Sequence, residues 1–423
     1  MLQPWTGGRL TLKILQDIKR NLADLTPNEI VLLLLTTSIF LTVYAEVLAL
    51  ILLPIYIFVT KQQFIFFRRK EDLIFLSIFW ILSMVVTIIY GGNLLDYLIG
   101  IGMIFVFVAM IFVTYTMTQR MFRVILSFCC IMSVPCFLIA CAQRWAGITW
   151  SYGARYSSVF YNPNYYAFFI ALVILFCIYN IVKSENKTSK ILYAILIPIN
   201  IVALYMTECR TTFVVVVLTC PIMLGFCKKK RWLYIYLGVI AALLLAGLLF
   251  GDTLTWIPRM DSIFADLQKR FSIWEGAIES IKDAPLFGRG YNSYVRINDL
   301  YGSYSAHHAH NLILELLLNF GIIGTLVLLF YFIINIKKII HLHRQNKCHT
   351  RYALTISVIV SVILHGFLDI TMLWPQTGLL LMYIVGFSTE YDKKHIFSTS
   401  RRHNLIQPPH PHKTREDFNS IRL

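Results

Sequence analysis

Apolar runs of about 20 residues recur along the whole chain and constrain its fold more than any other feature. A run of this length is enough to cross the hydrocarbon core of a bilayer as an α-helix. The runs are continuously apolar rather than alternating, which argues against a transmembrane β-barrel. Only 14% of the residues are charged and 57% are hydrophobic, whereas soluble proteins carry about a quarter charged residues. The sequence therefore predicts an all-α polytopic membrane protein.

The apolar runs predict about twelve transmembrane helices. The run 30–60 is too long for one span, so we expect a hairpin of two spans that turns near Tyr44–Glu46. The other ten spans are expected near 73–90, 95–117, 124–142, 165–182, 191–206, 213–227, 232–250, 310–335, 352–369 and 377–389. The first 28 residues lack a short apolar region followed by a small-residue cleavage site, so we expect no removable signal peptide.

This division of the chain predicts four regions. Residues 1–250 hold spans one to nine with short loops, 251–309 form one large loop, 310–390 hold spans ten to twelve, and 391–423 form a basic tail. We find no internal repeat of the kind that builds many transporters. The nine cysteines are an odd number and form no CxxC zinc pattern, so the sequence implies no disulfide framework and no zinc motif.

Positive charge is distributed unevenly between the two sides of the predicted membrane. An even number of spans puts both termini on one side, and only nine of the 38 Lys and Arg residues lie on the other side. The positive-inside rule therefore predicts cytoplasmic termini. The formal charge of +16 is then mostly an orientation signal, and we expect no nucleic-acid partner. The large loop and the loop 143–164 face outward together.

Three histidines, His307, His308 and His310, lie within four positions where the outward loop meets the tenth apolar run. Histidine is the side chain that can exchange a proton near neutral pH, so this cluster is the first candidate for chemistry. It can also be read as polar loop residues or as a metal site, because HHxH supplies enough imidazoles for zinc. The segment has neither an HExxH motif nor a nearby acid at ligand spacing, so we expect no metal.

The histidines lead directly into an apolar helix. His310 precedes Asn311, and Asn311 shares a helix face with Glu315, its i,i+4 neighbour. These positions favour His310 as a base at the membrane boundary. Gly321 and Gly324, further along, are expected to permit close helix packing.

Arginines are the second candidate group. Arg210 lies in a connection of about six residues between two apolar runs, where a charge is costly and needs a partner. It either snorkels to the interface or pairs with Glu208, or it offers a charged fork to a phosphate. Arg155 lies in a loop rich in aromatic residues, which are typical of an interfacial belt. The sequence Asn162-Pro163-Asn164 predicts a turn or helix start.

The large loop contains an amphipathic helical pattern over 268–294. The pattern predicts that Arg270 opens the helix and that Pro285 and Gly288-Arg289-Gly290 end it. The residues expected on one apolar face are Phe271, Trp274, Ala277, Ile278 and Ile281. Further on, His365 and Asp369 are i,i+4 neighbours, which predicts either a core hydrogen bond or a supporting role beneath the site.

Taken in order, five segments resemble the O-antigen ligase and polymerase superfamily of bacterial envelopes. They are FYNPNYYAF (160–168), Cys209-Arg210-Thr211, KRFSIWEGAIESIKDAPLFGRGYNSY (269–294), AHNLILELLLNFGIIG (309–324) and HGFLDITMLWP (365–375). The resemblance spans roughly residues 150–375. Twelve spans with one dominant outward loop are similar to the ligase, whereas polymerases typically carry two sizeable loops.

The resemblance implies a GT-C-like architecture and an inverting, metal-independent glycosyltransferase without a cofactor. Its donor would be a polysaccharide on undecaprenyl diphosphate, its acceptor a sugar hydroxyl of lipid A-core, and its location the periplasmic face of a Gram-negative inner membrane. His310 would be the base, although the resemblance alone does not choose between His310 and His308. Arg210, Arg270 and then Arg155 would bind the diphosphate. Supporting roles would fall on His308, Asn311, Asp369 and Arg289.

Other functions remain open at this point. An O-antigen polymerase shares the donor, and a protein O-oligosaccharyltransferase acts on Ser or Thr hydroxyls. A polysaccharide flippase or solute transporter fits the composition, but it predicts ionisable groups at mid-membrane depth. Here the Arg and His residues lie mainly at the membrane boundary, which favours an enzyme.

Overall fold

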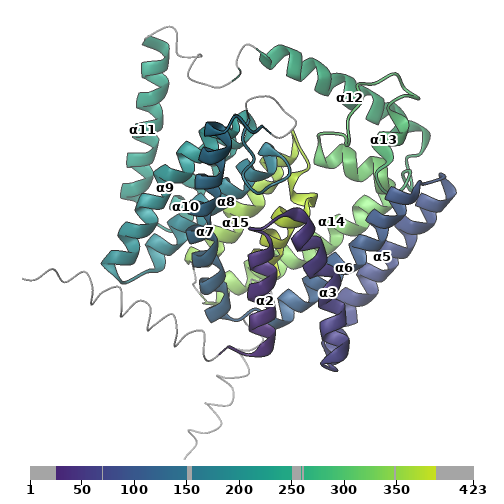
Figure 1. Cartoon of the computed structure of the whole chain (residues 1–423), viewed down its shortest axis with the longest axis horizontal. Helices are drawn as coiled ribbons and strands as arrows, with labels where there is room; N and C mark the ends of the chain where they lie inside the picture. The colour runs from purple at the N-terminus through teal and green to yellow at the C-terminus, as the bar shows by residue number, and fades with distance from the viewer. Residues whose placement is uncertain are drawn as a thin grey trace, which may run out of the picture.

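The fold is known from a computed structural model that describes residues 25–68, 70–149, 155–249, 259, 262–346 and 349–386. Within these ranges every regular element is a helix, which confirms the all-α prediction. The helices form a bundle, and α12 and α13 lie across one end of it (Figure 1). The helices are α2 (Pro27–Ser38), α3 (Val43–Val59), α4 (Phe64–Arg68), α5 (Lys70–Ile89), α6 (Leu94–Thr116), α7 (Gln119–Trp145), α8 (Pro163–Lys183), α9 (Lys187–Thr207), α10 (Arg210–Phe226), α11 (Lys230–Leu249), α12 (Ile263–Asp283), α13 (Ser293–Ile297), α14 (Leu312–Asn346), α15 (His349–Gly366) and the 3₁₀ turn η3 (Thr371–Leu373). Residues 375–386 are also helical.

Seven helices in the described ranges are long and apolar enough to cross a membrane. They are α5, α6, α7, α8, α9, α11 and the segment Leu312–Lys338 of α14. Two shorter apolar helices, α3 and α10, have 17 residues each. The chain is therefore a membrane protein with multiple apolar helices, while the full number of twelve spans stays a prediction.

The first two helices form the expected hairpin, but its turn lies earlier than predicted. Helix α2 ends at Ser38 and α3 begins at Val43. The side chain of Thr42 accepts a hydrogen bond from the Ala45 amide and caps α3, which is a common helix start. Glu46 consequently lies inside the first turn of α3 and is fully buried.

Helix α8 is the centre of the bundle. It packs against α7, α9, α10 and α15, and 83% of its most apolar stretch is buried. None of the corresponding stretch of α11 is buried, and α11 stands at the edge of the bundle (Figure 1). The central position of α8 fixes its first turn, where the segment Asn162-Pro163-Asn164 begins the helix as predicted.

Helix α14 is interrupted at Gly321, which has φ 63° and ψ −172°. A break inside an apolar helix exposes backbone groups that must find new partners. The loop after α12 supplies them. Arg289 and Gly290 donate their amides to the carbonyls of Leu318 and Asn319 at 2.9 and 2.8 Å. In return, the carbonyls of Pro285 and Leu286 accept the amides of Ile322 and Ile323 at 2.8 and 2.9 Å.

This exchange of hydrogen bonds explains why residues 288 and 321 are glycines. At Gly288, with φ 70°, a Cβ would lie 2.5 Å from the backbone nitrogen of Gly321. Gly321 was predicted to permit helix packing, but it instead permits the break and the close approach of a loop. The same loop reaches α5, because the Tyr291 amide donates to Thr87 Oγ1 at 3.0 Å.

The amphipathic helix of the large loop begins earlier than predicted, and its inner face agrees with the prediction only in part, because Ala277 is buried and Trp274 and Ile281 pack against the same cluster. It runs from Ile263, so Arg270 lies within α12 rather than at its start. Its buried residues are Ile273, Gly276, Ala277 and Ser280. Phe271 and Ile278 are exposed. A glycine lies on the inner face at position 276 because the Ser303 side chain is only 2.5 Å from the place that a Cβ would occupy there.

The end of α12 lies before Pro285 and Gly288-Arg289-Gly290, as predicted. Three other predictions lie outside the described residues. These are the polar start of the chain at residues 1–24, the loop residues 250–258, and the basic tail 391–423.

Replacing Gly288 with Ala is expected to lower the stability of the protein by about 3 kcal/mol, because the new Cβ meets backbone that cannot move aside. Gly91 is the matched control, since it has φ 65° and no atom within 4 Å of an added Cβ. Gly91→Ala should lose only about 1–2 kcal/mol for the left-handed conformation. Thermal unfolding in detergent measures both, and equal losses would contradict the backbone clash at Gly288.

Candidate functional site

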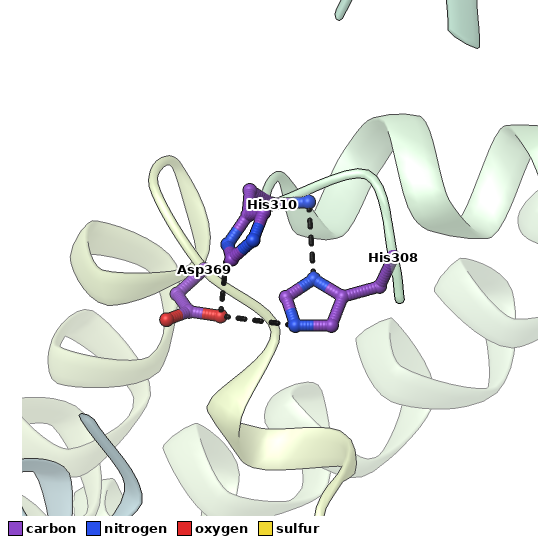
Figure 2. Close-up of side chains that lie close together, drawn as sticks. All are labelled: His308, His310 and Asp369. Carbon is purple, nitrogen blue, oxygen red and sulfur yellow. Dashed lines mark hydrogen bonds and ion pairs between the residues drawn. The ribbon is translucent and has the colours of Figure 1, made fainter. Parts of the chain in front are cut away.

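Two histidines and one aspartate meet where α14 and α15 come together. His310 Nδ1 lies 3.6 Å and His308 Nε2 lies 3.8 Å from the same oxygen, Asp369 Oδ1. The two imidazole rings are 4.1 Å apart between centroids. Figure 2 shows both rings on one side of the Asp369 carboxylate. The fold therefore joins the predicted histidine cluster to an acid nearly 60 residues further along the chain.

Hydrogen bonds to the first turns of α14 fix the loop that carries the histidines. The Glu315 carboxylate accepts the Ala309 amide at 2.8 Å and the Asn319 side chain at 2.8 Å. Asn311 accepts the amides of Ile313 and Leu314 and so caps the helix. His310, between these two anchors, has φ 47°. A non-glycine residue in this conformation is strained and persists only where its surroundings impose it.

The contacts of the two histidines distinguish their roles. His308 Nδ1 accepts the backbone amide of His310 at 3.1 Å, and its Nε2 faces Asp369, so both ring nitrogens are engaged. In His310 only Nδ1 faces Asp369, which leaves Nε2 without a partner among the described residues. The His310 side chain is also more exposed, at 28% against 13%. This geometry favours His310 as the histidine that meets a substrate.

The electrostatics of the cluster follow from burial and from the opposite charges in it. Burial, and next the charge of His310, lowers the pKa of His308 to about 3. His308 is thus neutral at physiological pH. Burial on its own raises the pKa of Asp369, but the contact with His310 and the positive charge of that imidazole outweigh it, so the pKa lies well below its usual value. Asp369 is ionised and can orient a neighbouring imidazole.

Asp369 is connected to Arg155 through one asparagine. Asn164 Nδ2 donates to Asp369 Oδ2, and Arg155 Nη2 donates to Asn164 Oδ1, both at 2.6 Å. Arg155 Nε also donates to the carbonyl of Thr207 at 2.9 Å. The predicted arginine therefore lies in the same network as the histidines, and two of its five N–H donors are occupied there.

Arg210 begins α10 and lies in an ion pair with the large loop. Its Nη2 is 2.6 Å from Asp266 Oδ2, and Arg259 Nη2 lies at the same distance from the same oxygen. Arg210 Nη1 also donates to the carbonyl of Arg259 at 2.5 Å. The partner of Arg210 is thus Asp266 on α12, and not Glu208 as one reading of the sequence suggested.

Arg270 lies one helical turn after Asp266 on α12 and has no hydrogen bond or ion pair with the described residues. Its positive charge is close enough to the histidine cluster to lower the pKa of His308. Arg289 has a different environment. It donates to the Tyr301 hydroxyl at 2.9 Å and lies over the Tyr90 ring at 5.4 Å, so its contacts are with the large loop and the end of α5.

His365 lies beneath the cluster but does not bond to the Asp369 side chain. Its two ring nitrogens lie 3.1 Å from the hydroxyls of Thr212 and Thr371. The Asp369 amide donates to the His365 carbonyl at 3.0 Å. The i,i+4 spacing thus reflects the end of α15 rather than a side-chain pair.

The cluster also has the donor atoms of a small metal site. His308, His310 and Asp369 each offer one ligand atom, and these atoms lie within 4.8 Å of one another. The sequence argument that no acid lies near the histidines was incomplete, because Asp369 is near only in the folded chain. His308 Nδ1 is already hydrogen-bonded, so a metal would have to use its Nε2.

Three residues of this site carry no clear signal in the sequence. Asp266 and Arg259 enclose Arg210, yet they lie about 50 residues away from it in the chain. Asn164 joins Arg155 to Asp369, although its position predicted only a helix start. The single advance indication was that these polar residues all belong to segments predicted to face outward together.

The fold and the site define a class: a helical membrane protein with a His–His–Asp cluster and several arginines at one end of its bundle. Residues 195–329, about a third of the chain, match the family model described as O-antigen ligase. This match supports membership of the chain in the O-antigen ligase and polymerase superfamily and confirms the resemblance inferred from its motifs. No curated protein matches the chain.

The stability of the protein is expected to fall as pH falls from about 6.5 toward 3 because of His308. In this range the unfolded chain binds a proton at His308 and the folded chain, with its pKa of about 3, does not. The difference between pH 7 and pH 5 is about 2 kcal/mol. Thermal unfolding of wild type and His308→Asn measures it, and the variant should lose less stability in acid.

The exposed neighbour His307 is the control for this measurement. His307→Asn should show the same acid sensitivity as wild type. If His308→Asn and wild type lose stability in parallel between pH 7 and pH 5, His308 is not held neutral in the folded protein.

Proposed function

We propose that the protein is an O-antigen ligase in lipopolysaccharide biosynthesis. It transfers a polysaccharide from undecaprenyl diphosphate to a sugar hydroxyl of lipid A-core, at the periplasmic face of a Gram-negative inner membrane. The presence of two imidazoles on one buried carboxylate, beside an arginine with no partner among the described residues, carries this proposal. The family match supports the class of reaction.

His310 is the proposed general base. Its Nδ1 faces Asp369 Oδ1 at 3.6 Å, which is longer than a hydrogen bond but within reach of a small side-chain movement. Such contacts are often long in free enzymes and shorten when the substrate binds. A proton on Nδ1, held by the ionised carboxylate, leaves Nε2 unprotonated to accept the proton of the attacking hydroxyl. Direct attack on the anomeric carbon with loss of the diphosphate inverts its configuration.

Arginines are the proposed stabilisers of the leaving group. As the anomeric bond breaks, negative charge develops on the lipid diphosphate, and guanidinium groups can receive it through charge-assisted hydrogen bonds without a metal. Arg270 is the strongest candidate, because it has no partner among the described residues and lies near His308. Arg210 and Arg155 are held by Asp266 and Asn164 and would have to exchange partners.

The remaining residues have supporting roles in this proposal. Asn311 caps the helix next to His310 and donates to the Phe367 carbonyl at 3.1 Å, which connects the starting point of α14 to the loop that bears Asp369. His308 holds the His310 backbone through its Nδ1. Arg289 stabilises the large loop over α5. With cytoplasmic termini, the four regions 1–250, 251–309, 310–390 and 391–423 would put this cluster on the periplasmic side.

The nearest alternative is an O-antigen polymerase, which shares the donor and the superfamily. Lipopolysaccharide from a deletion strain separates the two functions. Loss of a ligase leaves core without O-antigen while lipid-linked polymer accumulates, and loss of a polymerase leaves core that bears a single repeat unit. A protein O-oligosaccharyltransferase would leave lipopolysaccharide unchanged, and loss of a flippase would leave the donor on the inner leaflet.

Purified wild-type protein is expected to transfer lipid-linked O-antigen to lipid A-core in the presence of EDTA, and His310→Ala is expected to lose the activity by a factor of about 100 to 10,000. The reason is that His310 is the group that accepts the proton, with no metal in its place. Gel analysis of the product measures transfer.

His307→Ala is the matched control, because it removes an exposed imidazole from the same loop. It should keep the wild-type activity. If EDTA abolishes wild-type transfer and a divalent metal restores it, then His308, His310 and Asp369 form a metal site and the metal-free mechanism is wrong. If wild type elongates lipid-linked repeats but never modifies lipid A-core, the protein is a polymerase.

Arg270→Gln is expected to lower kcat/KM for the lipid-linked donor about a hundredfold, because it removes one charged donor from the developing diphosphate. Lys269→Gln removes the same charge from the neighbouring position, where the ammonium lies 5.5 Å from the Tyr304 ring, and should change kcat/KM little. Initial rates at varied donor concentration give both values. Equal effects of the two variants would indicate a general electrostatic influence instead of a specific contact.

A further inference from the structure

An aromatic stack lies beside the His308–His310–Asp369 cluster and takes no part in the proposed reaction. The Trp374 ring is parallel to two tyrosine rings, with centroids 5.4 Å from Tyr161 at 25° and 4.6 Å from Tyr165 at 19°. Tyr165 is buried and Trp374 is half-buried, whereas Tyr161 is 50% exposed. The stack therefore runs from the protein interior to its surface and ends in one open aromatic ring.

Both sides of the stack come from the segments that build the site. Trp374 lies five residues after Asp369, and Tyr161 and Tyr165 flank Asn164. Asn164 is the residue that donates to Asp369 Oδ2 at 2.6 Å. The start of α8 and the segment 369–374, which meet at this hydrogen bond, thus meet a second time at the stack, and this places the aromatic rings beside the cluster.

The stack is fixed before any ligand arrives. Trp374 Nε1 donates to Gln376 Oε1 at 3.2 Å, and Gln376 Nε2 donates to the Ile39 carbonyl at 2.8 Å, which ties the tryptophan to the end of α2. A ring that is already ordered loses little entropy when it binds a partner.

We propose that the Tyr161–Trp374 stack is a saccharide subsite that holds one pyranose ring next to His310. A pyranose has two faces of C–H groups, which pack against a flat aromatic ring, and hydroxyls around its edge, which need polar partners. The exposed Tyr161 ring supplies the flat face, and the polar cluster at Asn164 and Asp369 lies beside it. The Tyr161 hydroxyl has no hydrogen bond with the described residues, so it is available to the sugar as well.

This inference rests on the proposed function for the identity of the sugar, which belongs either to the donor polysaccharide or to the acceptor core. The chemistry of recognition is the same for both. The test therefore uses two lipid-free probes from the strain that encodes the protein: core oligosaccharide released from lipid A, and O-antigen polysaccharide released from its diphosphate. Because neither probe carries a lipid, neither can bind through the membrane.

Saturation-transfer NMR on the full chain in nanodiscs measures the binding of each probe to wild type, Tyr161→Phe and Tyr161→Leu. Phenylalanine keeps the flat ring, whereas leucine keeps apolar bulk for lipid but has no flat face. We expect the affinity of Tyr161→Leu for one probe to fall about three- to tenfold, as for the loss of one aromatic contact. Tyr161→Phe should remain within about twofold of wild type, and the affected probe identifies the source of the sugar.

Trp145→Leu is the matched control, because Trp145 ends α7, begins the same outward loop and is 92% exposed. It should bind both probes like wild type. Binding of Tyr161→Leu equal to wild type would show that Tyr161 is a lipid contact and would overturn the subsite. Equal losses in Tyr161→Leu and Trp145→Leu, or equal losses in the Phe and Leu variants, would also overturn it.

A second measurement does not depend on a variant that folds. Site-specific 3-fluorotyrosine at position 161 keeps the wild-type ring, and its ¹⁹F signal should shift when the bound probe is added. No shift with either probe, at concentrations that saturate binding, overturns the subsite. Glycan transfer by wild type is measured separately. If a probe shifts the signal at Tyr161 but the protein transfers no glycan, the subsite stands and the ligase proposal fails. If the protein transfers glycan normally but neither probe shifts the signal, the ligase proposal stands and the subsite fails.

Discussion

The break in α14 at Gly321 is the constraint on which the rest of the structure depends. Backbone groups released inside an apolar helix must be paired, and the loop 285–290 pairs with them on both sides of the break. This fixes the end of α12 against the bundle. Just before the break, Asn319 accepts hydrogen bonds from Ser293 and donates to Glu315, which in turn holds Ala309 next to the histidines. One irregularity thus sets the positions of α12, α13 and the loop that carries His308 and His310 together.

Asp369 organises the charge at this end of the bundle. A buried carboxylate is costly unless it is paired and hydrogen-bonded, and here it receives Asn164, the Ile370 amide and two imidazoles. The same surroundings hold His308 neutral through burial. His308 is therefore a neutral group with both ring nitrogens engaged, and His310 keeps one nitrogen that has no partner among the described residues. This division favours His310 over His308 as the histidine that meets a substrate, a choice that the spacing HHxH leaves open.

The sequence predicted the parts of this structure that depend on local pattern. Apolar runs predicted the helices, and Asn162-Pro163-Asn164 predicted the start of α8, because helix length and capping are local properties. The residue pattern singled out the histidine cluster, and the family resemblance suggested roles for His308, His310 and Asp369, but their meeting at one oxygen is a product of tertiary packing. The inner face of α12 was predicted only in part for a related reason: Trp274, Ala277 and Ile281 pack inward, but Phe271 and Ile278 do not. Hydrophobicity predicted Phe271 inside, whereas close approach to Ser303 selects the smaller Gly276.

The pairing of Arg210 and Arg259 with Asp266 bears on how a diphosphate would bind. An internal carboxylate already neutralises part of this positive charge, so an anionic donor has to compete with it and gains less in the ground state. In the transition state the leaving diphosphate carries more charge, and it competes better for the same guanidinium groups. Interactions that strengthen only in the transition state raise the rate rather than the affinity. Under the proposed function, Asp266 therefore weakens the binding of the donor while leaving the stabilisation of its departure largely intact.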